Sequence, residues 1–153
     1  MANTYTQIYI QAIFAVKYRN AVLDKGWRDK VFATIGNLIN ESGASAIIVN
    51  GVEDHVHTFF TIKPTLTISK ILQSVKGKSS KYINESYFLQ ERFEWQEGFG
   101  AFSYSQSQIN AVSNYIKNQE KHHKQKTFQQ EYIDFLNKFK VDYNEDYLFK
   151  ELQ

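Results

Sequence analysis

Strict alternation of side chains in two segments constrains the fold of this chain more than any other feature. The first segment covers residues 4–16, where every second position belongs to one face: Thr6, Ile8, Ile10, Ala12, Phe14 and Val16. Residues 55–63 alternate in the same way. Because successive side chains of a strand point to opposite faces of a sheet, both segments are predicted to be half-buried strands.

The rest of the chain supplies helical periods and two shorter strand patterns. Apolar residues recur with helical spacing from Asp24 to Gly43, from Thr67 to Tyr82 and from Ser105 to Ile116, with Asp24, Thr67 and Ser105 as expected N-terminal caps. Short strands are expected at 46–49 and 99–104. A further amphipathic helix is predicted at 128–139, followed by a docked tail at 141–149.

The order strand, helix, strand, strand, helix, strand is that of a split βαβ arrangement. We therefore expect an α+β, ferredoxin-like (RRM-like) antiparallel sheet with helices on it, plus a C-terminal helix from Ser105 and a further helical tail. With 153 residues, 42% hydrophobic and 22% charged, residues 1–153 are expected to form a single globular domain.

Composition excludes several classes of function. The chain has no cysteine, which excludes a disulfide scaffold, a cysteine zinc site and thiol catalysis. The apolar runs are too short for a membrane span, and the N-terminal residues lack the pattern of a secretory signal. A cytoplasmic protein of bacterial type, without membrane association, is expected.

Basic residues are concentrated in two segments although the net charge is only +2. The first segment, residues 61–84, has no acid and contains Lys63, Lys70, Lys76, Lys78 and Lys81. The second, residues 117–126, has four lysines and two histidines against Glu120. Lysine suits point contacts to backbone phosphates, so the first five are candidate phosphate contacts, and they become predicted DNA-binding residues through the family resemblance described below. A merely solvated face remains the alternative for either segment.

The pair His55 and His57 is the strongest chemical signal. In a strand the two imidazoles share a face about 7 Å apart, within reach of one metal ion. Tyr115 and Gln119, at helical spacing i and i+4, share one face of a helix. An amide or oxygen ligand beside imidazoles suits a magnesium- or manganese-like ion more than zinc. Spacing alone favours the simpler alternative, in which Tyr115 is a core residue and Gln119 a solvated one.

Several segments, taken together and in order, resemble the single-tyrosine HUH transposases of the insertion-sequence 200/605 family and their REP-associated relatives. The resemblance covers nearly the whole chain. It is carried by Glu53-Asp54-His55-Val56-His57, Lys76-Gly77-Lys78-Ser79-Ser80, Trp95-Gln96-Glu97-Gly98-Phe99-Gly100-Ala101-Phe102, Tyr115-Ile116-Lys117-Asn118-Gln119 and residues 120–131. At the four positions of the histidine pair and the Tyr-x-x-x-Gln motif we find no departure from the family.

The resemblance implies a function and assigns roles. His55, His57 and Gln119 would be ligands of Mg²⁺ or Mn²⁺, and Tyr115 would be the nucleophile. The family cleaves single-stranded DNA, typically with hairpin ends, through a 5′-phosphotyrosine intermediate, and then rejoins strands. It works as a homodimer in which the helix that carries the tyrosine can belong to the partner subunit. His122 and His123 are expected to be solvated surface residues, and no general acid or base is identified.

Two alternative functions remain open at this point. A catalytically silent nucleic-acid-binding module of the RRM type would share the fold, but residues 98–104 match the RNP1 pattern poorly, because Glu97 stands where a basic residue is required. A domesticated relative that acts on repeat hairpins would keep the same site. The RRM alternative predicts no metal dependence, and genomic context separates the domesticated relative from a mobile element's own enzyme.

Overall fold

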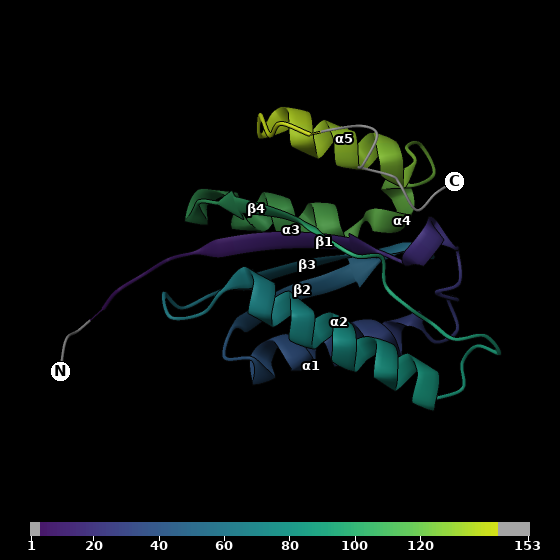
Figure 1. Ribbon diagram of the computed structural model, residues 1–153. Coiled ribbons are helices and arrows are strands. Elements are labelled where there is room, and N and C mark those ends of the chain that lie inside the picture. The colour runs from purple at the N-terminus through teal and green to yellow at the C-terminus, as the bar shows by residue number, and fades with distance from the viewer. Residues whose placement is uncertain (1–3, 144–153) are drawn as a thin grey trace.

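The computed structural model describes residues 4–143 and contains an antiparallel sheet of four strands in the order β2-β3-β1-β4 (Figure 1). The strands are β1 (Tyr9–Ala15), β2 (Ser45–Gly51), β3 (His55–Thr61) and β4 (Gly100–Tyr104). The helices are α1 (Arg28–Glu41), α2 (Ile68–Glu85), α3 (Ile109–Lys117), α4 (Gln119–His122) and α5 (Phe128–Lys138), with short 3₁₀ turns η1 (Lys17–Arg19) and η2 (Gln106–Gln108). The expected ferredoxin-like α+β fold is confirmed.

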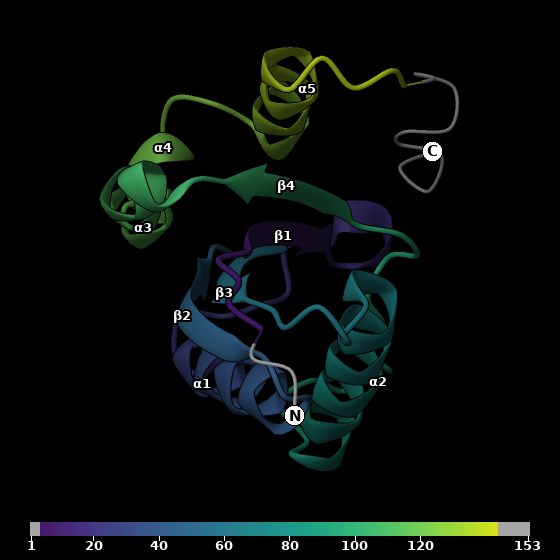
Figure 2. The same cartoon turned by 90° about the vertical axis from the view of Figure 1, so that its left-hand side faces the viewer.

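Helices cover both faces of the sheet. Figure 1 and Figure 2 show α1 and α2 on one face and α3, α4 and α5 on the other. The larger core lies under α1 and α2 and takes the even-numbered residues of β1 together with Val56 and Phe60 of β3. Burying each large apolar side chain here contributes about 1.5–3 kcal/mol. The alternation predicted for residues 4–16 and 55–63 therefore directs successive side chains to opposite faces of the sheet, as expected.

The second face is covered by two separate packing contacts. Helix α3 places Val112 and Ile116 on Phe59 of β3. Helix α5 forms a different cluster on β1 and β4, in which Phe135 packs with Phe102. The two apolar clusters leave a seam between α3 and α5, directly above β1 and β3. His55 and His57, two of the odd-numbered residues on this face of the sheet, are buried there.

Local signals explain most helix starts. The side chain of Thr67 accepts a hydrogen bond from the backbone N–H of Lys70, as expected of an N-cap. Ser105 and Gln108 form the predicted capping box, although the first turn after it is 3₁₀. Asp24 is not the cap of α1: its Oδ1 accepts from Gly26 N (2.8 Å) in a turn, and α1 starts only at Arg28.

Two strand boundaries also differ from the sequence expectation. Strand β1 starts at Tyr9 rather than Thr4, since residues 4–8 extend beyond the neighbouring strands that could pair with them for most of their length. Strand β2 covers Ser45–Gly51 rather than residues 46–49, and its connection to β3 turns at residues 52–54, where Val52 N donates to the carbonyl of His55 (3.2 Å). The tail predicted at 141–149 lies mostly outside the described residues. Within residues 4–143, no helix is long and apolar enough to cross a membrane.

Lys76 has a structural role within the described part of the chain. Its ammonium group donates to the carbonyls of Gln96 (2.6 Å) and Gly98 (2.8 Å), and it lies 5.8 Å from the ring centroid of Phe14. These contacts attach α2 to the segment that leads into β4. Lys76 is half-buried, whereas the other four predicted DNA-binding lysines are exposed.

Replacing Lys76 by methionine keeps the apolar stem and removes the ammonium group. We expect Lys76→Met to lower the free energy of unfolding by about 1–3 kcal/mol, because two carbonyls lose a charged donor. Urea denaturation measures the change. Lys78→Met is the matched control, since Lys78 is exposed on the same helix, and equal stability of the two variants would contradict this role.

Candidate functional site

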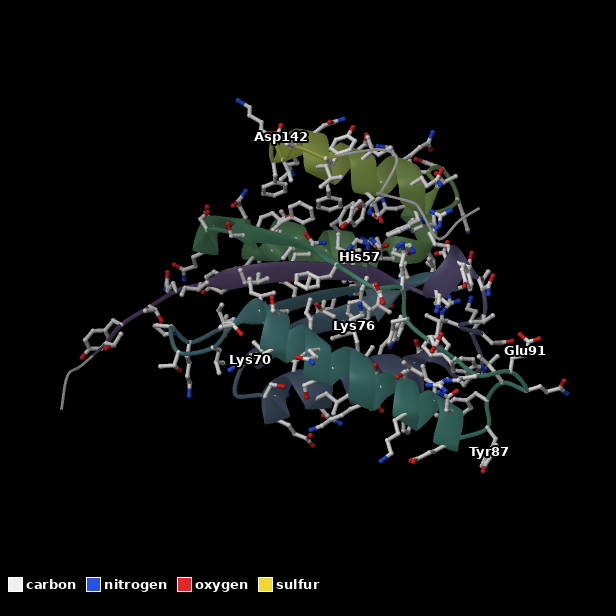
Figure 3. All side chains as sticks on the ribbon, in the orientation of Figure 1. His57, Lys70, Lys76, Tyr87, Glu91 and Asp142 are labelled. Atoms are coloured by element: carbon white, nitrogen blue, oxygen red, sulfur yellow. The ribbon has the colours of Figure 1, made fainter. Side chains whose placement is uncertain are left out.

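The two histidines of β3 are completely buried beneath α3 and α5. His55 and His57 are each 0% exposed, and their ring centroids lie 5.2 Å apart. Between them, Val56 points to the opposite face and into the main core. A pair of imidazoles buried in this way requires polar partners, because an unpaired buried polar group costs free energy. In Figure 3, His57 lies on the sheet face opposite to the labelled lysines of α2.

Glu131 of α5 supplies the central partner. Its Oε1 lies 3.3 Å from Nε2 of His55, 3.0 Å from Nε2 of His57 and 3.2 Å from Nε2 of His123. Its Oε2 accepts a hydrogen bond from the hydroxyl of Tyr115. The Glu131 side chain is only 4% exposed, and a buried carboxylate is tolerated when it is paired and hydrogen-bonded.

Gln119 reaches the same point through a break between two helices. α3 ends at Lys117, and α4 begins at Gln119 after Asn118 leaves the helical conformation. The side chain of Asn50 in β2 donates to the carbonyls of Ile116 (3.0 Å) and Lys117 (3.2 Å), which satisfies carbonyls at the end of α3. Gln119 is 0% exposed, and its Oε1 lies 3.3 Å from Nε2 of His55.

The Nδ1 atoms of both histidines, which point away from the centre of the site, also have hydrogen-bond partners. Nδ1 of His55 donates to Oδ1 of Asp54 (2.7 Å), and Nδ1 of His57 lies 2.9 Å from Nε2 of Gln11. The hydroxyl of Tyr104 donates to Oε1 of Gln11 (2.7 Å). Such partners fix ring orientation and leave Nε2 of each ring directed at the centre of the site.

Electrostatics distinguish the two imidazoles. Burial would lower the pKa of His55, but its hydrogen bonds to Asp54 and Glu131 outweigh burial and raise the pKa above its ordinary value. For His57, burial dominates, and the pKa is lowered despite the hydrogen bond to Glu131. Burial would raise the pKa of Glu131, yet the hydrogen bonds from His123, His55 and His57 lower it below the usual range.

The Tyr115 hydroxyl is held in its protonated form in this arrangement. Burial raises the pKa of Tyr115 above its ordinary value, and the adjacent Glu131 carboxylate raises it further. The ring lies 6.0 Å from that of His57 and stacks on His122 at 4.4 Å between centroids. Tyr115 is therefore oriented from two sides, with its oxygen directed to the polar cluster.

The donor atoms fit a divalent metal ion. One atom each from His55, His57, His123 and Glu131 lie within 4.8 Å of one another, slightly more than twice a metal–nitrogen bond of about 2.1 Å. Oε1 of Gln119 faces the same nitrogens. Three imidazoles and one carboxylate form a donor set that suits Mn²⁺ or a later transition metal better than Mg²⁺.

The structure brings the predicted residues His55, His57, Gln119 and Tyr115 together within one chain. Tyr115 and Gln119 thus lie beside the histidine pair of their own chain. The expectation for the two later histidines was wrong. His122 is half-buried against Tyr115, and His123 contacts both Gln119 and Glu131.

Sequence reasoning also missed Glu131, for which a signal existed. Phe128, Glu131 and Phe135 fall at i, i+3 and i+7 on the buried face of α5, so a carboxylate stands in an apolar stripe. Likewise, His123 extends the four-residue spacing of Tyr115 and Gln119 by one step. A charged residue in an apolar stripe is informative because it is rarely buried without a partner.

Comparison with known families identifies the class of protein to which this fold and this cluster of residues belong. The family model described as "Transposase IS200 like" matches residues 4–119. The chain therefore belongs to the IS200-like transposase family, as its motifs indicated. His123 and Glu131 lie beyond the matched segment.

Solved structures show the same fold. A protein assigned as a transposase from Deinococcus radiodurans has a TM-score of 0.64 at 19% identity, covering 78% of this chain and 95% of that one. A REP-associated tyrosine transposase bound to a REP hairpin has a TM-score of 0.59 at 13% identity, covering 80% and 73%. No curated protein sequence matches the chain significantly.

Adjacent histidines provide a sharp test of the metal centre. We expect His123→Ala to weaken Mn²⁺ binding at least about tenfold, since removing even an outer partner of a metal ligand costs that much. His122→Ala should bind Mn²⁺ as the wild type does, because His122 does not belong to the donor group. Isothermal titration calorimetry measures both affinities, and equal losses in the two variants would contradict the assigned donor set.

Proposed function

We propose that this protein cleaves and rejoins single-stranded DNA, with Tyr115 as the nucleophile and a divalent metal ion as cofactor. The observation that carries the proposal is the convergence of the Tyr115 hydroxyl and four metal-capable groups on one buried point. A silent binding module would gain nothing from burying so many polar groups together. Membership of the IS200-like family supports the same reaction.

The proposed reaction is a transesterification. The oxygen of Tyr115 forms a bond to the scissile phosphorus, and the bond from phosphorus to the 3′ oxygen breaks. The products are a 5′-phosphotyrosine and a 3′-OH, which takes up a proton as the phenol loses one. Oε2 of Glu131 accepts a hydrogen bond from the Tyr115 hydroxyl, so Glu131 orients the attacking oxygen. Rejoining reverses these steps without an external energy source.

His55, His57 and Gln119 are the proposed ligands, and His123 and Glu131 complete the donor group. When bound, a divalent ion polarises the phosphate and offsets the charge that develops on its oxygens. Of the two ions that the resemblance implies, Mg²⁺ and Mn²⁺, the three imidazoles favour Mn²⁺. Asp54 and Gln11 then keep the rings aligned through their outer nitrogens.

Single-stranded DNA with hairpin ends is the proposed partner. A structural neighbour bound to a REP hairpin supports this choice. Lys63, Lys70, Lys78 and Lys81 remain proposed phosphate contacts, whereas the ammonium of Lys76 is already engaged by two carbonyls. Because α2 lies across the sheet from His57 (Figure 3), lysines of α2 would contact DNA away from the scissile phosphate.

The homodimer implied by the resemblance stays a prediction, as do the single domain over residues 1–153 and action in the cytoplasm at the nucleoid. Dimerisation would not be needed to assemble the site, since Tyr115 and the donor group belong to one chain. A domesticated enzyme would act on scattered repeats, and a mobile element's own enzyme would act on the ends of that element. Genomic context distinguishes the two.

One substitution tests the reaction class directly. With labelled single strands that carry the flanks of its own gene, we expect the wild type to form a covalent protein–DNA adduct with Mn²⁺ and none with EDTA. Tyr115→Phe should form no adduct because the attacking oxygen is gone, while DNA binding stays within about twofold. A denaturing gel measures the adduct and fluorescence anisotropy the binding.

Tyr87→Phe serves as the control, since Tyr87 is 87% exposed and remote from the donor group. Its adduct should equal that of the wild type. An adduct that persists in Tyr115→Phe would overturn the assignment of the nucleophile. Salt-sensitive DNA binding with no adduct under any metal would favour the silent module instead.

A further inference from the structure

A pocket opens beside Tyr115, between α3 and α5. It has a volume of about 340 Å³, and its walls include Gln11, Tyr104, Gln108, Ala111, Phe135 and Lys138. Tyr115 and Glu131 belong to both the pocket and the polar cluster. The pocket is thus continuous with the place where the scissile phosphate would sit.

We propose that this pocket receives one unpaired nucleotide of the DNA strand, next to the phosphate that Tyr115 attacks. This inference rests on the proposed function and names a substrate contact that the site itself does not supply. A volume near 340 Å³ is at the lower end for small-molecule pockets, which fits one nucleoside rather than a run of bases.

The pocket wall offers flat aromatic surface. Phe135 and Tyr104 line it from α5 and β4, and aromatic rings of this kind stack on bases of any sequence. Burial raises the pKa of Tyr104 to about 12, so its ring carries no charge that would repel a phosphodiester. The hydroxyl is fixed on Gln11, which in turn contacts His57.

Gln108 contributes a side-chain amide to the wall of the pocket. Its Oε1 is used in the capping box, where it accepts from the backbone N–H of Ser105 (3.0 Å). Its amide nitrogen has no hydrogen-bond partner among the described residues, and is therefore available to donate to an acceptor on a base edge. At the rim, the exposed side chain of Lys138 offers a cation for the adjacent phosphate.

The helix that forms one wall lies outside the family match. α5 covers Phe128–Lys138, whereas the match ends at residue 119. Four residues that line the pocket come from this helix: Glu131, Asp134, Phe135 and Lys138. One wall of the pocket therefore comes from residues beyond the family match, whereas Gln11, Tyr104 and Ala111 on the other walls lie within it.

Abasic substrates and a filling variant test the proposal together. Each nucleotide beside the scissile phosphate is replaced in turn by an abasic residue. At one position the wild type should lose about five- to 150-fold in the rate of adduct formation, the range expected for one stacked base. Ala111→Leu, which fills the pocket from α3, should slow adduct formation with the intact strand to a similar extent. With the abasic strand it should cause no further loss of rate.

Asn110→Leu is the matched control, an equally exposed position of α3 outside the pocket, and should cleave both strands at the wild-type rate. Thermal unfolding checks that both variants fold. The abasic series uses the wild-type protein, so its result does not depend on the folding of a variant. Adduct formation that is indifferent to every abasic position would overturn the pocket and leave the cleavage function intact. Absence of any adduct with intact strands would overturn both.

Discussion

A buried carboxylate that is surrounded by imidazoles is the interaction on which the second half of this structure depends. Glu131 is nearly inaccessible, and its charge is compensated by hydrogen bonds from three histidines and from Tyr115. These partners come from β3, α3 and the end of α4, whereas Glu131 itself belongs to α5. Without these partners the carboxylate would be an uncompensated charge in a poorly hydrated place, which typically costs several kcal/mol.

The apolar clusters on either side explain why this polar group can exist. α3 packs on β3 through Val112 and Ile116, and α5 packs on β1 and β4 through Phe135 and its neighbours. Neither α3 nor α5 covers the whole of the sheet face that carries the odd-numbered residues of β1 and β3. The remaining seam is narrow enough to exclude most water from the histidines, yet it is open at the pocket beside Tyr115. Stability of the scaffold comes mainly from the other face, where α1 and α2 cover the larger core.

The sequence predicted the sheet and the paired histidines well because both depend on a period of two. Once residues 55–61 form a strand, His55 and His57 must share a face, and the neighbouring Val56 must enter the core. The helix caps at Thr67 and Ser105 depend on residues only a few positions apart, so they were predictable for the same reason. Asp24 failed as a cap because its side chain satisfies a turn before the helix instead.

Local patterns could mark Glu131 and His123 as unusual residues but could not show that they meet the histidine pair. Their position depends on how α4 and α5 fold back over the sheet, which is a tertiary property of the chain. The same limit applies to Lys76, whose charge suggested a phosphate contact but whose ammonium binds two backbone carbonyls. Charge identifies candidates, and only packing distinguishes a solvated lysine from a structural one.

Mapping the covalent bond tests the central claim most directly. The adduct formed with Mn²⁺ is digested with trypsin and nuclease, and the modified peptide is identified by mass spectrometry. Among the 10 tyrosines of the chain, our account predicts that the nucleotide is attached to Tyr115 alone. Attachment to any other tyrosine, or to a different residue type, would contradict it.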